Sequence, residues 1–213
     1  MCKLLYKELR LAAHPSMYIF LFMGALVLIP AYPYGVIFFF GMLGIFQSVM
    51  YGRETRDIYF TVLLPLSKRD TVKAKLLLAA FAQLTELIIS LPFAFLRTLY
   101  LADGNPVGME PNAAFYGIGL MIFGVFNLVF FSQFFKTAYK AGTAFLIALI
   151  PAVLGIIVME SLVHFPGMEW LDSTAGPQIV RQLPILLAGI AVYVGTWFWA
   201  CASAEKSFEK VNL

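Results

Sequence analysis

Long uninterrupted apolar blocks dominate the pattern of this chain. No charged residue occurs in the stretches 17–51, 111–135, 141–159 and 182–204. Runs such as VIFFFGMLGIF and FLIALIPAVLGIIVM do not alternate between apolar and polar residues, as the strands of a membrane barrel do. About 20 mainly apolar residues form a helix that crosses a bilayer core of about 30 Å, and backbone in lipid must satisfy its own hydrogen bonds. The pattern therefore predicts an all-α polytopic membrane protein.

Turns and charged connectors divide the apolar blocks into six predicted transmembrane helices. PAYPYG ends the first span, and KTAYK separates the fourth span from the fifth. The predicted spans cover about residues 16–31, 36–51, 76–101, 113–135, 141–162 and 183–204. The whole chain, 1–213, is then a single transmembrane domain.

A basic amphipathic segment precedes the first span. In CKLLYKELRLAA the basic residues recur at helical spacing on one face and apolar residues lie on another, and Pro15 ends the segment. This pattern is typical of a helix at a membrane surface, and we predict an interfacial helix over 1–14. A solvated cap on the cytosolic side is the alternative.

Composition and charge place this protein in a membrane and predict its orientation. The chain is 61% hydrophobic and 13% charged, whereas a soluble domain is about 45–50% apolar and about 25% charged. With six spans, all 15 Lys and Arg residues except Arg97 and Arg181 fall on the side of the termini. Because basic residues stay cytoplasmic, both termini are predicted to be cytoplasmic.

One stretch, GRETRDIYFTVLLPLSKRDTVKAK at 52–75, gathers charge in an otherwise apolar chain. A basic cytoplasmic loop can simply set topology and touch anionic lipid. The loop also contains the apolar segment IYFTVLLPL at 58–66, which is too short to span the membrane. An exposed apolar segment between mixed charges is typical of a protein docking surface. We therefore predict a cytoplasmic protein partner for 52–75.

This stretch resembles the loop between spans 2 and 3 of ABC-2-type exporter permeases, and CKLLYKELRLAAHPSMYIFL resembles the start of that family's shorter members. Within the family, the chain is most similar to permeases of the phenol-soluble-modulin exporter type. The resemblance implies a coupling helix in 52–75 that rests in a cleft of a separate ATPase subunit. The residues assigned to that contact are Arg53, Glu54, Arg56, Asp57, Ile58, Tyr59, Phe60, Leu63, Leu64, Lys68, Arg69 and Asp70.

The energy source is expected in that partner subunit. The chain contains no G-x-x-x-x-G-K-[ST] motif to cradle phosphates, so we expect no enzymatic activity, with ATP and Mg bound by the partner and no cofactor here. Six spans are half of such an export pathway, which implies a second permease subunit in a homodimer or heterodimer. The resemblance implies a bacterial cell membrane, and amphipathic peptides or other apolar cargo. No nucleic-acid partner is expected.

Polar residues inside the third span form a stripe on one helical face. Gln83, Glu86 and Ser90 follow helical spacing, with Asn127 of the fourth span at a similar depth. An acidic residue in lipid is costly, so the stripe should face protein or water. It lines either the transport route or a polar seam between helices, with Glu86 protonated in the second case. Arg97 and Glu160 are expected to snorkel to the outer interface.

No catalytic motif or metal-ligand spacing is present in the sequence. Two other functions remain possible at this point. One is a membrane scaffold or regulator that recruits a cytoplasmic protein. The other is an ion-coupled transporter that uses Glu86 as its proton site. Whether the outer loop 164–182 re-enters the membrane is left open.

Overall fold

The computed structural model describes residues 2–63, 66–100 and 104–211, and within these ranges the chain forms helices and no strand. The elements are α1 (Cys2–Lys7), the π-helix η1 (Glu8–Ala12), α2 (Pro15–Phe20), the 3-10 helix η2 (Leu21–Leu28), α3 (Val36–Glu54), α4 (Asp57–Leu63), α5 (Lys68–Tyr100), α6 (Ala113–Phe134), α7 (Ala141–Leu162), the 3-10 turn η3 (Glu169–Leu171) and α8 (Gly176–Phe208).

The N-terminal segment bends sharply where it meets the bundle. Lys3–Ala12 and Pro15–Leu28 lie at 103° to each other. The bend is fixed locally, because Pro15 opens α2 and the His14 ring accepts a hydrogen bond from Ser16 N at 3.2 Å. His14 N in turn donates to Ser48 Oγ of α3 at 3.1 Å. These bonds anchor the corner to the bundle.

The first predicted span is short and partly 3-10 helical. The six residues of α2 rise about 1.5 Å each and the eight of η2 about 2.0 Å each, so Pro15–Leu28 reaches about 25 Å. Five helices, α3, α5, α6, α7 and α8, are long and apolar enough to cross a membrane, and up to six if the bent N-terminal pair is one span. The all-α polytopic prediction is confirmed; the sixth span and the interfacial helix remain predictions.

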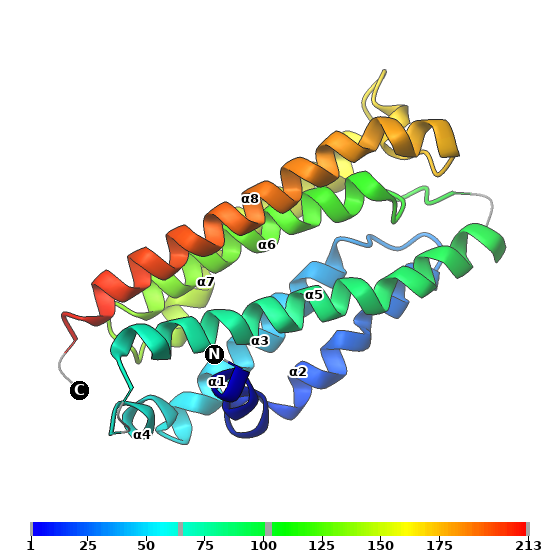
Figure 1. Cartoon of the computed structure of the whole chain (residues 1–213). Helices are drawn as coiled ribbons and strands as arrows, with labels where there is room; N and C mark the ends of the chain where they lie inside the picture. Colours follow the sequence, from blue (N-terminus) through cyan, green and yellow to red (C-terminus); the bar gives the residue numbers. More distant parts are fainter. Residues whose placement is uncertain (1, 64–65, 101–103, 212–213) are drawn as a thin grey trace.

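The helices pack as two groups. Figure 1 shows α6, α7 and α8 together on one side, and α2, α3 and α5 on the other. In the first group, α6 and α8 cross at a glycine of each helix, Gly117 and Gly189. A Cβ on Gly117 would lie 2.7 Å from Ile185 O, and one on Gly189 would overlap the Gly117 backbone. Small residues allow such close contact between membrane helices.

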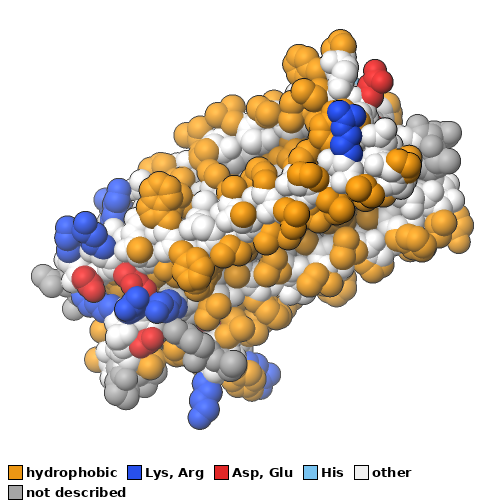
Figure 2. All heavy atoms as spheres, turned by 45° about the horizontal axis from the view of Figure 1, so that its top comes forward, with side chains coloured by type: hydrophobic (Ala, Val, Ile, Leu, Met, Phe, Trp, Pro, Cys, Tyr) orange, Lys and Arg blue, Asp and Glu red, His pale blue; other side chains and the backbone are white. Residues whose placement is uncertain are grey.

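Charge collects at one end of the bundle. Figure 2 shows most of the Lys and Arg side chains at the end that carries α4, with apolar side chains over the middle. Both termini lie toward this end (Figure 1). Two helices extend into the predicted loops, since α5 begins at Lys68 and α8 begins at Gly176 with Pro177 in its first turn.

Candidate functional site

The short helix α4 leaves the end of α3 at a sharp turn. Arg56 holds a left-handed conformation there, with φ 55°, which costs a residue with a Cβ about 1–2 kcal/mol. Arg56 N donates to Arg53 O at 3.1 Å and closes the turn. α4 therefore starts at Asp57 in a direction set by the backbone.

The two faces of α4 differ in burial. Ile58 and Thr61, three residues apart, turn inward and are buried. Tyr59, Phe60 and Leu63 turn outward, and Leu63 is 82% exposed. The apolar segment predicted from the sequence is thus divided between the bundle core and an exposed face. Leu64, also assigned to the contact, lies outside the described residues.

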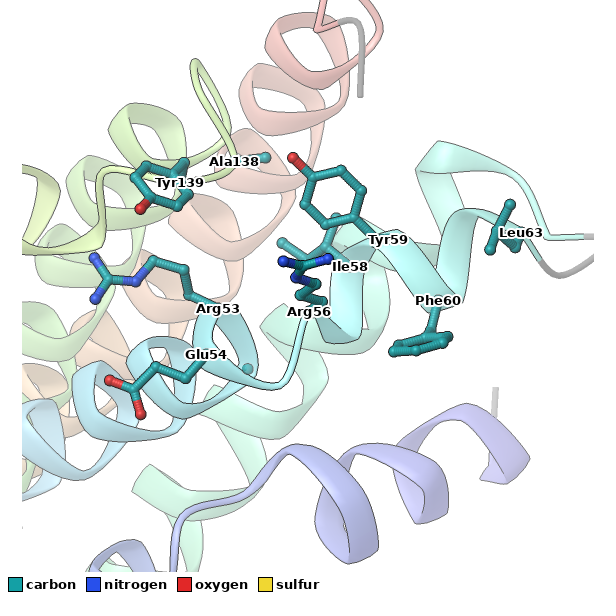
Figure 3. A pocket seen from close by; sticks show the side chains of 10 residues that line it. Arg53, Glu54, Arg56, Ile58, Tyr59, Phe60, Leu63, Ala138 and Tyr139 are labelled. Atoms are coloured by element: carbon teal, nitrogen blue, oxygen red, sulfur yellow. The ribbon is translucent and has the colours of Figure 1, made fainter.

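A pocket of about 720 Å³ opens beside this exposed face. Arg53 and Arg56 line it together with Tyr59 of α4 and Tyr139 of the connector between α6 and α7 (Figure 3). The Arg53 guanidinium lies 5.2 Å from the centre of the Tyr139 ring, within cation–π range. Glu54 also lines the pocket, so two cations and one carboxylate lie among the aromatic rings. The net positive lining suits a partner that presents acidic and apolar groups together.

The buried face of α4 rests on a four-charge cluster, which we call the Lys75 cluster: Lys7, Glu8, Asp57 and Lys75. Lys75 Nζ lies 2.6 Å from Glu8 Oε2 and 2.6 Å from Asp57 Oδ2. Lys7 Nζ lies 2.9 Å from Asp57 Oδ1 and donates to Thr61 Oγ1 at 2.8 Å. Lys7 Nζ is also 2.9 Å from Glu8 Oε1, in a geometry that makes a charge contact without a hydrogen bond.

Charge in the Lys75 cluster is balanced. Two ammonium groups face two carboxylates, so the buried charges compensate one another. Burial raises the pKa of Asp57, but the ammonium groups of Lys75 and Lys7 outweigh burial and hold the pKa of this carboxyl below its ordinary value. Asp57 therefore stays ionised at neutral pH.

The last three assigned residues, Lys68, Arg69 and Asp70, also contact this chain itself. Lys68 Nζ donates to Val211 O at 2.7 Å and reaches Phe208 O and Glu209 O at 3.3 Å, beyond the end of α8. Arg69 pairs with Glu205 at 3.0 Å. Ser67 caps the start of α5, since its Oγ accepts from Asp70 N at 3.1 Å, and the Asp70 carboxylate accepts back from Ser67 Oγ at 2.6 Å. The second half of 52–75 thus ties α5 to the C-terminal segment.

Inside the bundle, the predicted stripe on α5 joins the two helix groups. Gln83 and Asn127 exchange two hydrogen bonds, at 3.0 and 2.7 Å, and Tyr193 Oη of α8 donates to Gln83 Oε1 at 2.8 Å. Ser90 Oγ lies 2.9 Å from Tyr116 Oη of α6. The structure places the stripe between α5 and the α6–α8 group, and it adds two tyrosines to the predicted set.

Glu86 lies in the same seam without a hydrogen bond. It is fully buried, and neither carboxyl oxygen has a partner among the described residues. Its side chain fills the space in front of Gly41 of α3, where a Cβ would overlap it, and Phe123 of α6 is adjacent. A buried polar group without a partner is costly, and packing alone does not account for a glutamate at this position, which makes Glu86 a candidate functional residue.

The end of the bundle opposite α4 contradicts the snorkelling expected for Arg97 and Glu160. Arg97 is buried and forms a bidentate pair with Glu110 at 2.7 and 2.8 Å, and its guanidinium lies 5.0 Å from the centre of the Tyr34 ring. Glu160 accepts backbone N–H groups from Gly35 and, at 2.9 Å, from Met109. Partners in the outer loops hold both side chains inside the protein, so neither has to reach the interface.

Sequence reasoning missed most of the Lys75 cluster. The sequence places Lys7 on the basic face of the N-terminal segment and Lys75 in the basic stretch 52–75, but it predicts no ion pair for Lys7, Glu8 or Lys75. One signal was available, since Glu8 is an acidic residue within a basic amphipathic segment. Among the described residues, no group of three or more His, Cys, Asp or Glu side chains could hold a metal ion.

Comparisons with known proteins address the chain as a whole. A family model described as ABC-2 family transporter protein matches residues 3–205. No curated protein and no solved structure gives a significant match. The family match covers α1 through most of α8, so it includes α4, the Lys75 cluster and the polar seam.

Proposed function

We propose, because this chain belongs to the ABC-2 family of transporter proteins, that it is the permease of an ATP-driven exporter whose separate ATPase subunit docks on α4. Membrane proteins of this family generally work with a cytoplasmic ATPase, and the apolar helices make this chain a multi-pass membrane protein. The end that carries α4 is then cytoplasmic, with both termini, and a bacterial cell membrane is the proposed location.

The exposed face of α4 is the observation that carries this proposal. Tyr59, Phe60 and Leu63 are exposed at the basic end, next to a pocket that contains two arginines. A partner with an apolar cleft and acidic groups at its rim would bury this face and pair with Arg53 and Arg56. ATP and Mg belong to that partner in this proposal.

The transport route is proposed to involve the polar seam. Gln83, Glu86, Ser90 and Asn127 are buried where the two helix groups meet, inside the third and fourth predicted spans. Separation of the groups would expose polar side chains to a cargo that carries both apolar and polar parts. Amphipathic peptides are the proposed cargo, as in the phenol-soluble-modulin exporter type, and a second permease subunit is proposed to complete the pathway.

The test is a docking measurement with matched variants. The chain is purified from its native membranes in mild detergent, and the copurifying ATPase is identified by its Walker motifs and then titrated. Leu63→Asp is expected to weaken binding by about 30-fold, the effect of losing a central interface residue worth about 2 kcal/mol. Lys210→Asp, an exposed change at the same end, serves as the control. Equal binding by both variants would exclude α4 as the docking site.

A further inference from the structure

The Lys75 cluster joins three parts of the chain that are distant in sequence. Lys7 and Glu8 come from the N-terminal segment, Asp57 from the first turn of α4, and Lys75 from the first turns of α5. α4 is a helix of seven residues, which is too short to be stable by itself. Its position therefore depends on the contacts that its buried face makes.

Burial makes these contacts strong. Glu8 is fully buried and Lys75 almost so, while Asp57 and Lys7 are only slightly exposed. An exposed ion pair contributes little, but removal of one partner from a buried pair leaves an uncompensated charge in the protein. Lys75 is the central member, since its ammonium group bridges one carboxylate from α4 and one from the N-terminal segment.

Local geometry makes room for this arrangement. Glu8 begins the π-helical segment η1, and such segments occur often at functional sites because they redirect side chains. Gly52 of α3 borders the cluster, where a Cβ would lie 3.5 Å from Lys75 Nζ, an ordinary contact distance. Thr61 adds a second contact from α4 by accepting from Lys7.

We propose that Lys7, Glu8 and Lys75 are positioning residues that link α4 to the N-terminal segment and to α5, so that these three parts move as one unit. This inference rests on the proposed function, in which an ATPase moves α4. A displacement of α4 would then move α5 through Lys75. It would also move the polar stripe Gln83, Glu86 and Ser90, because Lys75 and the stripe belong to the same continuous helix. The N-terminal segment becomes a moving part of the coupling device rather than a passive anchor.

The first test measures the link in the chain alone, without ATPase or cargo. In a chain with Cys2 and Cys201 replaced by Ala, spin labels are attached at Leu11→Cys and Leu63→Cys, both exposed positions. Distances between the labels are measured by pulsed electron paramagnetic resonance in lipid vesicles. The parent chain is expected to give a single narrow distribution.

Variants of the cluster are expected to release α4. Glu8→Gln and Lys75→Met each leave a buried charge uncompensated, which shifts the ratio of linked to released α4 by roughly 100-fold or more and broadens the distribution. Lys3→Met removes an equivalent charge from an exposed position in the same segment and is expected to change nothing. Unchanged distributions in both cluster variants would overturn the inference.

The second test measures coupling with the ATPase subunit present. Lys75→Met and Glu8→Gln are measured at ATPase concentrations that saturate each variant, so that a change in docking affinity does not enter the result, and cargo moved per ATP hydrolysed is expected to fall several-fold. An unchanged ratio in variants with released α4 would refute the transmission role. Absence of ATPase binding by the parent would refute the proposed function instead, and the spin-label comparison would still decide whether the link exists.

Discussion

The buried pair between Arg97 and Glu110 allows a sharp prediction about the outer end. Arg97→Met keeps most of the side-chain volume but removes both hydrogen bonds to Glu110 and the cation beside Tyr34. The carboxylate of Glu110 would then remain buried without a cation, and Asp172, whose carboxyl accepts from Glu110 N at 2.7 Å, would be a second carboxyl group close by. Loss of one partner from a buried pair costs about 3–5 kcal/mol.

Neutralising the remaining charge should recover most of that loss. The double variant Arg97→Met, Glu110→Gln removes both charges of the pair, so neither remains buried alone. We expect its free energy of unfolding to lie within about 1–2 kcal/mol of the parent. The comparison of single and double variants measures the interaction of the two side chains directly.

The assay is equilibrium unfolding in mixed detergent micelles, followed by tryptophan fluorescence. Arg181→Met provides the exposed comparison at the same end, and its folded baseline is measured separately because Arg181 lies 4.7 Å from the centre of the Trp170 ring, a reporter in this assay. A snorkelling Arg97 would behave like an exposed pair and cost about 0–1 kcal/mol. A loss of that size in Arg97→Met, or a double variant as unstable as the single one, would refute the buried-pair interpretation.

Three further predictions concern the seam, the helix crossing and the Lys75 cluster. Glu86→Gln should fold like the parent because Glu86 makes no hydrogen bond, and both it and Glu86→Ala should reduce transport; normal transport by both in vesicles would rule out a pathway role. Gly189→Leu should destabilise the protein by about 1–3 kcal/mol, because α6 and α8 must separate, and an unchanged melting temperature would contradict that packing. Folding lowers the pKa of Asp57, so the ionised carboxylate stabilises the position of α4 above the unfolded pKa, near 4, and this stabilisation is lost as pH falls through the lower folded pKa. Release of α4 above about pH 5 in the spin-label assay would argue against this.

Much of the fold follows from the sequence because lipid imposes few solutions. Uncharged blocks longer than a bilayer requires must be helices, and charge marks their ends. The same cost of polarity in lipid explains why Gln83, Glu86 and Ser90 could be assigned to a buried face of one helix. Asn127 was matched to them by depth alone, and the structure shows its side chain bonded to Gln83.

The choice of partners could not be predicted, because it depends on how helices pack. Lys75 belongs to a basic stretch that sets topology equally well if every lysine points to water, and only the tertiary structure brings it to Glu8 and Asp57. Arg97 was expected at the interface since its partner, Glu110, lies in an irregular loop whose path no periodicity reveals. The division of α4 into two faces is also invisible in the run IYFTVLLPL, which is apolar on every side.

The 3-10 geometry of η2 makes this segment longer than an α-helix of the same eight residues would be. An α-helix rises about 1.5 Å per residue and a 3-10 helix about 2.0 Å, so rewinding the eight residues of η2 would shorten it by about 4 Å. The N-terminal segment joins α2 at the His14 corner, and η2 follows α2. A shorter η2 would therefore draw the N-terminal segment toward the end of the bundle opposite α4. A change of winding in η2 alone would therefore move the N-terminal segment relative to the rest of the bundle while the chain stays helical.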